Sequence, residues 1–238
     1  MSIKIDKKEV LRYLGGNAKN NDEVTDQLID EGIEEIKKIS IPKSQFRIFD
    51  IKKNQNNIQI LNSILILKGK DIIKHLIHSK KVAIMAVTLG IQVDKRIKYY
   101  SNIDLAKAVI LDACATTYIE AISDNLEIEI KEIANQSNCN ITFRYSPGYG
   151  DLSLFNQDEI LKILNSSRRI GLTVSNEHIL IPSKSVTAII GFEDKSIKKP
   201  TGKVQKRADN EKCKTCRNYK NCIYLEEGTF CEFRKKNL

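Results

Sequence analysis

The feature that most constrains the fold is a helical pattern that runs unbroken from Ser101 or Asn102 to about Asn135. Apolar residues recur there at the spacing of one helix face, and the many alanines let a sheet or another helix approach closely. Ser101, followed three residues later by Asp104, predicts the start of this helix. Two acidic residues, Asp112 and Glu120, stand within the otherwise apolar stretch. We therefore expect one long, closely packed helix that carries two unusual carboxylates.

Shorter elements surround this helix. Runs rich in β-branched and aromatic residues predict strands at 46–52, 58–67, 81–88 and 141–145, and two or three more at 171–192. The polar run 54–57 predicts a hairpin between the first two. Amphipathic patterns predict helices at 22–40, 71–79 and from Asn156, capped with Glu159, to near Ser167. The predicted fold class is α+β: a single mixed body with a central, largely antiparallel sheet flanked by helices, plus a small Cys-rich C-terminal module.

The composition excludes some classes of protein. The 238 residues suit one large domain, or one domain with an appendage, and the hydrophobic share of 41% is enough for a sizeable core. The longest uncharged apolar stretch, 82–93, is shorter than the ~20 residues that a membrane span needs. No apolar segment follows the lysine near the N-terminus, so we expect no signal peptide and a cytoplasmic protein.

The positive charge belongs to the C-terminal end. Residues 195–238 hold 13 Lys and Arg against 5 Asp and Glu, which is +8 of the net +9, whereas residues 1–194 carry +1. We divide the chain into a body at 1–193, a basic polar linker at 194–210 and a cysteine module at 211–238. A basic tail can bind nucleic acid through phosphates, and a nucleic-acid-binding protein with a basic zinc tail is the alternative from another class. The usual DNA- and RNA-binding signatures are missing.

Four cysteines lie in one 19-residue stretch of that C-terminal end. Cys213, Cys216, Cys222 and Cys231 are separated by two, five and eight residues, whereas Cys114 and Cys139 stand alone in the body. Without a signal peptide, a metal site is a better interpretation than a disulfide scaffold. Four thiolates at this spacing suit an iron–sulfur cluster or one Zn²⁺. Both alternatives stay open, with iron–sulfur placed first.

The loop Arg144-Tyr145-Ser146-Pro147-Gly148-Tyr149 resembles the Arg-x-x-Pro-Gly-Tyr loop of the activation domain of cobalamin-dependent methionine synthase. Other segments agree in order and spacing. They are Val87-Thr88-Leu89-Gly90 followed by Asp94, the helical run 106–113 with Glu120 beyond it, and Ile181-Pro182-Ser183-Lys184-Ser185-Val186. The likeness covers about residues 1–193. We expect this domain to be a separate activation subunit, which would lack the folate, homocysteine and cobalamin modules.

The resemblance implies binding of S-adenosylmethionine for the reductive remethylation of cob(II)alamin. Cobalamin would be carried by a corrinoid or methionine synthase partner, and the electron would come from a flavodoxin- or ferredoxin-type donor. The implied binding residues are Glu120, Arg144, Ser146, Gly148 and Tyr149. The chain would act as a component of a methyltransferase and not alone. An alternative is a reductive activator of another corrinoid methyltransferase.

Overall fold

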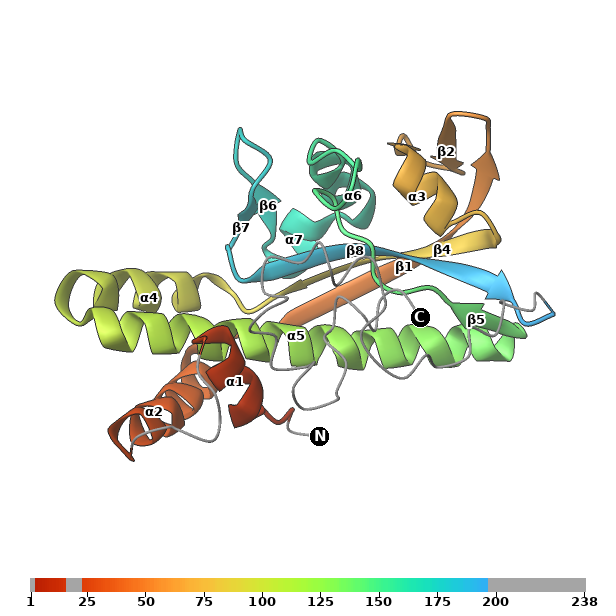
Figure 1. Cartoon of the computed structure of the whole chain (residues 1–238). Coiled ribbons are helices and arrows are strands. Elements are labelled where there is room, and N and C mark those ends of the chain that lie inside the picture. The colour runs from red at the N-terminus through yellow and green to blue at the C-terminus, as the bar shows by residue number, and fades with distance from the viewer. Residues whose placement is uncertain (1–2, 16–22, 197–238) are drawn as a thin grey trace. The chain divides into compact units, whose positions relative to one another are not determined.

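The computed structural model describes residues 3–15 and 23–196 (Figure 1). The chain divides into two units, residues 1–195 and 196–238, and the description below concerns the first. Nearly all of the predicted linker and the whole cysteine module therefore lie outside the described residues. So do all four tail cysteines.

The first unit is built on a six-stranded sheet with the order β3-β2-β1-β4-β8-β5, in which every neighbouring pair is antiparallel. The strands are β1 (Lys43–Lys53), β2 (Asn57–Ile60), β3 (Ile66–Lys68), β4 (Ser79–Thr88), β5 (Cys139–Ile141) and β8 (Ser185–Asp194). A small second sheet pairs β6 (Thr173–Val174) with β7 (Leu180–Ile181). The predicted α+β class with a largely antiparallel sheet is confirmed.

Helices cover both faces of this sheet. They are α1 (Lys7–Tyr13), α2 (Glu23–Ile39), α3 (Lys70–His75), α4 (Ile91–Ile103), α5 (Leu105–Gln136), α6 (Asn156–Leu164) and α7 (Ser166–Ile170). The long helix α5 runs along one face, and α3, α6 and α7 lie on the other (Figure 1). None of the helices in the described part of the chain is long and apolar enough to cross a bilayer.

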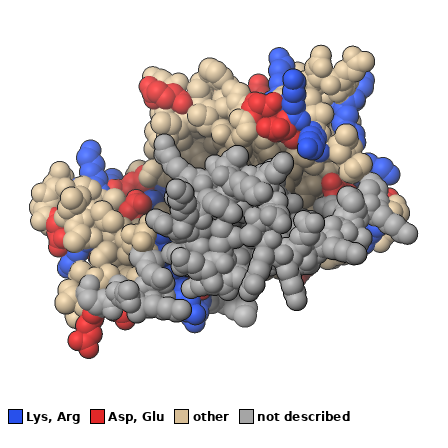
Figure 2. All heavy atoms as spheres, viewed as in Figure 1, with Lys and Arg blue, Asp and Glu red and all other residues tan. Residues whose placement is uncertain are grey.

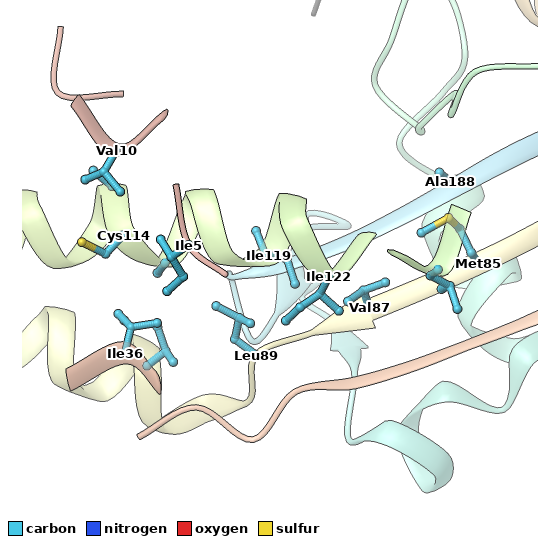
Figure 3. Packing of buried hydrophobic residues seen from close by; sticks show 14 of the residues in the cluster. Ile5, Val10, Ile36, Met85, Val87, Leu89, Cys114, Ile119, Ile122 and Ala188 are labelled. Carbon is cyan, nitrogen blue, oxygen red and sulfur yellow. The ribbon is translucent and has the colours of Figure 1, made fainter. Parts of the chain in front are cut away.

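Strand β4 explains why the core has two halves. Its side chains alternate between the faces, as an extended backbone requires. Ala83, Met85 and Val87 pack into a cluster with α1, α2 and α5, part of which Figure 3 shows. Val82, Ile84 and Ala86 pack into a second cluster with α3 and α6. Because both faces of β4 are covered, its sequence is a continuous apolar run from Val82 to Val87.

The predicted start of the long helix was wrong. Asp104, not Ser101, caps α5, and its carboxylate accepts a hydrogen bond from the Lys107 amide at 3.1 Å. Ser101 lies inside α4, a helix that the sequence did not predict, and donates its hydroxyl to the Ile97 carbonyl. The two helices meet at Asp104, so one residue ends α4 and begins α5.

Two other boundaries also differ. The predicted strand 58–67 is two strands, β2 and β3, joined by a turn in which Asn62 has a positive φ. The predicted cap Asn156 is the first residue of α6, and its side-chain amide donates to the Ile66 carbonyl across the fold instead. In α2 the buried face carries Ile29, Ile33 and Ile36, whereas Val24 is exposed.

Acidic and basic side chains are mixed over the described part of the face in Figure 2, around α1, α2 and α4. This mixture agrees with the nearly balanced charge of residues 1–194. The ion pairs of this region include Arg96 with Glu35 at 3.0 Å and Lys7 with Asp26 at 2.7 Å.

Candidate functional site

Arg144 is positioned by the chain that continues from β5 along the edge of β8. The Thr142 amide donates to the Gly191 carbonyl at 2.9 Å, and Tyr145 and Ile189 exchange both backbone hydrogen bonds. Extended backbone sends successive side chains to opposite sides. Phe143 and Tyr145 therefore pack toward α3 and its His75, and Arg144 turns toward α5.

Three carboxylates of α5 surround the Arg144 guanidinium. Nη2 lies 2.9 Å from Glu120 Oε2 and 2.8 Å from Asp124 Oδ1, and Nε lies 3.2 Å from Glu127 Oε2. The Arg144 side chain is 6% exposed, against 28%, 60% and 30% for Glu120, Asp124 and Glu127. We call these four residues the Arg144 cluster. Its formal charge is −2.

One nitrogen of this guanidinium donates no hydrogen bond within the described residues. Nη1 of Arg144 is buried and has no hydrogen-bond partner among residues 3–15 and 23–196. Buried polar atoms without a partner are rare and call for an explanation, such as a ligand or a water molecule. The guanidinium fork is suited to a carboxylate.

The loop after Arg144 is tightly turned. The Tyr149 amide donates to the Ser146 carbonyl at 3.1 Å, and the Gly148 amide donates to the Leu152 carbonyl at 2.8 Å. Gly148 has φ +90°, a conformation that glycine adopts at little cost, and a Cβ there would lie 3.0 Å from the Leu154 side chain. The loop therefore needs glycine at this position.

The aromatic residues of the loop stack away from α5. The Tyr149 ring meets the Tyr145 ring edge-on with centroids 6.3 Å apart, and the Tyr145 hydroxyl donates to the Tyr149 carbonyl at 3.3 Å. Tyr149 is about half exposed. Burial and two nearby carboxylates, Asp71 and Asp151, raise the pKa of Tyr145 above its ordinary value.

The sequence-predicted residues are brought together in part. Glu120 and Arg144 are in direct contact, whereas Ser146, Gly148 and Tyr149 belong to one loop that follows Arg144. Sequence reasoning missed Asp124 and Glu127. Their spacing from Glu120, four and seven residues, places all three on one helix face and was the available signal.

Asp112 and Asp94 hold the loop between β7 and β8. The second unusual carboxylate of the long helix, Asp112, lies 2.9 Å from Lys184 Nζ, which also donates to the Thr116 hydroxyl. Both oxygens of Asp94 accept hydrogen bonds from Ser183, one from its amide and one from its hydroxyl. Asp94 and the 181–186 segment, which belong to the family resemblance, therefore meet in space.

A sequence model of the family described as "Vitamin B12 dependent methionine synthase, activation domain" matches residues 43–214. The chain belongs to this family. The match covers the whole sheet, α5 and the Arg144 loop, and it supports a role associated with methyl transfer. It agrees with the expectation drawn from the Arg144–Tyr149 loop.

A solved structure supports the same fold. The crystal structure of the MetH reactivation domain bound to AdoHcy superposes with a TM-score of 0.57 at 14% identity, covering 79% of this chain and 70% of that one. At this identity the likeness shows the fold alone. A comparison with curated protein sequences gives no match.

The described residues of the body do not form a candidate metal site. Between residues 3–15 and 23–196, no three His, Cys, Asp or Glu side chains are grouped so that they could hold a metal ion. Of the two cysteines there, Cys114 is buried and Cys139 partly buried, and both are free thiols. The metal prediction concerns Cys213, Cys216, Cys222 and Cys231, which lie outside the described residues.

Proposed function

We propose that this chain is the activation subunit of cobalamin-dependent methionine synthase, which binds S-adenosylmethionine and acts on a separate corrinoid protein. The observation that carries the proposal is the Arg144 cluster: a buried guanidinium with one unpartnered nitrogen, in contact with three carboxylates of α5, in a chain of this family. The bound AdoHcy of the structurally similar domain is an independent reason to choose this ligand class.

The side chains present suit the amino-acid end of the ligand. Nη1 of Arg144 would donate a charge-assisted hydrogen bond to the ligand carboxylate. Glu120, on the same side, would accept from the ligand ammonium group. Gly148 lets the backbone approach a ligand closely, and the half-exposed ring of Tyr149 offers an aromatic face to a cation or to adenine.

The proposed reaction consumes one electron and one methyl group. One electron from a flavodoxin- or ferredoxin-type donor reduces partner-bound cob(II)alamin to cob(I)alamin. The cobalt then takes CH₃⁺ from the sulfonium with its own electron pair, which forms the Co–C bond and breaks the S–C bond. The products are methylcobalamin and S-adenosylhomocysteine. The cobalt carries the chemistry, and this chain binds and orients the methyl donor.

Calorimetric titration of the full chain with S-adenosylmethionine tests the binding step. We expect saturable binding that Arg144→Ala weakens by ~1.5–3 kcal/mol, the value of a hydrogen bond to a charged group. Arg168→Ala is the matched control, since Arg168 is exposed on α7. Absence of binding at millimolar ligand by the folded wild-type chain and its corrinoid partner together would contradict the proposal.

Remethylation of a corrinoid partner tests the reaction. Methylcobalamin, followed by its visible spectrum, should form only when electron donor, S-adenosylmethionine and this chain are all present, and Glu120→Gln and Tyr149→Ala should slow it. A candidate partner from methionine synthesis that stays unchanged, while another corrinoid methyltransferase is remethylated, would favour the reductive activator of that enzyme instead.

We further propose that Cys213, Cys216, Cys222 and Cys231 bind an iron–sulfur cluster or a zinc ion. An iron–sulfur cluster would suit a reaction that consumes an electron. Anaerobically purified protein should contain either about four irons with sulfide, and be brown, or about one zinc, and be colourless. The double variant Cys213→Ser/Cys216→Ser should lose this metal while the far-UV circular dichroism of the body persists. Full metal content in the variant would place the ligands elsewhere.

A further inference from the structure

An open hollow lies between the last residue of α2 and one face of α4. Its volume is about 350 Å³, and its walls are formed by Ile39, Gln92, Lys95, Arg96 and Tyr99. The last four residues are spaced three and four apart in α4, so they share one side of that helix. Small-molecule sites in proteins span ~300–1,000 Å³. The hollow is therefore large enough for a small ligand.

The side chains around the hollow carry a net positive charge. Glu35 Oε1 lies 3.0 Å from Arg96 Nη1, and Glu35 also accepts a hydrogen bond from the Tyr100 hydroxyl at 3.1 Å, which fixes Arg96 at the wall. Among the described residues, the side chains of Lys95 and Gln92 have no hydrogen-bond or ion-pair partner. Two cations against one carboxylate leave +1, so the hollow favours an anion.

Tyr99 adds an exposed aromatic surface to the same hollow. It is 55% exposed, and its ring centroid lies 5.5 Å from that of Tyr100, with 59° between the ring planes. Lys95 precedes Tyr99 by four residues, so the ammonium group and the ring are neighbours on the helix surface. Such a pair suits a ligand that packs a ring on tyrosine while its charged group meets the cation.

We propose that this hollow binds a small organic anion, a carboxylate or phosphate joined to a flat ring. The anionic group would accept hydrogen bonds from Lys95, Arg96 and Gln92, and the ring would pack on Tyr99. The walls share no residue with the Arg144 cluster or with its loop. Figure 1 shows α4 at the left end of the body and β5, which leads to Arg144, at the right. The inference therefore does not rest on the proposed function.

A ligand in this hollow would also stabilise α4. Val93 is the buried residue of this helix, so α4 has little apolar packing of its own. A molecule held between Ile39 and α4 would add contacts that exist only in the folded chain. Binding to the folded state raises the free energy of unfolding in proportion to the logarithm of ligand concentration. The melting temperature is therefore a readout that is independent of any activity.

Titration of the isotope-labelled full chain at low ionic strength, followed by amide chemical shifts, tests the proposal. The probes are phenyl phosphate and benzoate, which share the ring and differ in the anion. At least one should bind saturably, shift the amides of α4 and raise the melting temperature, and the tighter of the two identifies the anionic group. Phenol has the ring without the anion, and inorganic phosphate has the anion without the ring. Both should bind about threefold more weakly or worse.

Variants of exposed residues of α4 locate the site. Lys95→Gln should weaken binding about threefold, and Tyr99→Ala by a similar factor. Lys98→Gln is the matched control, since it removes the same charge from an exposed position of α4 that does not line the hollow. Its affinity should equal that of the wild type. Arg96 is left unchanged because it pairs with Glu35.

Three results would overturn the inference. They are no saturable binding of either anion at millimolar concentration, phenol binding as tightly as the anions, and equal affinities of Lys95→Gln and Lys98→Gln. None of them bears on the titration with S-adenosylmethionine, because Lys95 lies outside the site proposed for that ligand. Failure of that titration would equally leave this inference unaffected.

Discussion

Nη2 of Arg144 lies 2.9 Å from Oε2 of Glu120, although 24 residues separate the two in the chain. The contact forms because the chain turns back after α5, pairs with β8 and returns antiparallel to the helix that it has just left. Helix α5 and the edge of the sheet are therefore joined by a buried cation, and the family's conspicuous loop begins at that point.

Loss of that cation should destabilise the body. Arg144→Ala removes the partner of three carboxylates and leaves them facing one another, so we expect the free energy of unfolding to fall by about 1–3 kcal/mol. This is less than for a fully buried pair, since the carboxylates are 28–60% exposed. Urea denaturation followed by far-UV circular dichroism measures it, with Arg168→Ala as the control. Equal midpoints for Arg144→Ala and wild type would show that the cluster does not support the fold.

Gly150 should tolerate alanine poorly. It has φ +53°, and a Cβ would lie 2.5 Å from the Tyr145 hydroxyl and 2.6 Å from Asp71 Oδ2. Gly171 has φ +70° but nothing within 4 Å of a Cβ. Gly171→Ala should therefore lower the free energy of unfolding by about 1 kcal/mol, through backbone strain alone. Gly150→Ala should lower it by about 2–4 kcal/mol, because the steric clash adds to the strain. Thermal unfolding of both variants compares them, and similar losses would contradict the steric argument.

The hydroxyl of Thr142 should contribute more to the free energy of unfolding than its methyl group does. It accepts a hydrogen bond from the buried Gly191 amide at 2.8 Å and lies 2.9 Å from His75 Nε2. Thr142→Val keeps the shape but leaves that amide unpaired, which should cost about 1–3 kcal/mol. Thr142→Ser keeps the hydroxyl, so it should lose less. Urea midpoints rank the two, and a serine variant weaker than the valine variant would be the contrary result.

Cys114 should make stability depend on pH. Burial is the main cause that raises the pKa of its thiol from 9.0 to about 12, and the nearby Asp30 adds to the rise. The folded state therefore disfavours the thiolate. The thiol's contribution is complete below the unfolded pKa and is lost as pH rises from about 9 toward 12, by up to about 1.4 kcal/mol per pH unit.

Cys114→Ala removes this group and leaves the four tail cysteines and Cys139 unchanged. The difference in unfolding free energy between wild type and variant should hold steady up to about pH 8.5 and shrink above it. Urea denaturation at pH 7.5, 8.5 and 9.5 measures the difference. Parallel profiles over this range would mean that the buried thiol ionises freely in the folded protein.

The sheet and the long helix follow from local patterns. Alternation and apolar runs predicted the strands because an extended chain repeats every two residues. The periodicity of about 101–135 predicted α5 because a helix repeats every 3.6 residues. Helix α4 was not predicted because its apolar residues do not define a buried face. Ile91, Tyr99 and Ile103 are exposed, and its buried residue is Val93. The N-cap of α5 was missed for the same reason: Asp104 can be recognised as that cap only when α4 is known to end there.

For the candidate site, the order of motifs along the chain determined the family and singled out Arg144 and Glu120. Tertiary structure decided which carboxylates meet the guanidinium. The spacing of Asp124 and Glu127 from Glu120 indicates a shared helix face, but it does not show what that face meets. They contact Arg144 because α5 and the strand edge pack side by side, which joins segments 17 to 24 residues apart. The sequence gives the type of each residue. The charge around a buried group such as Arg144 depends instead on which side chains surround it, and only the folded chain determines these.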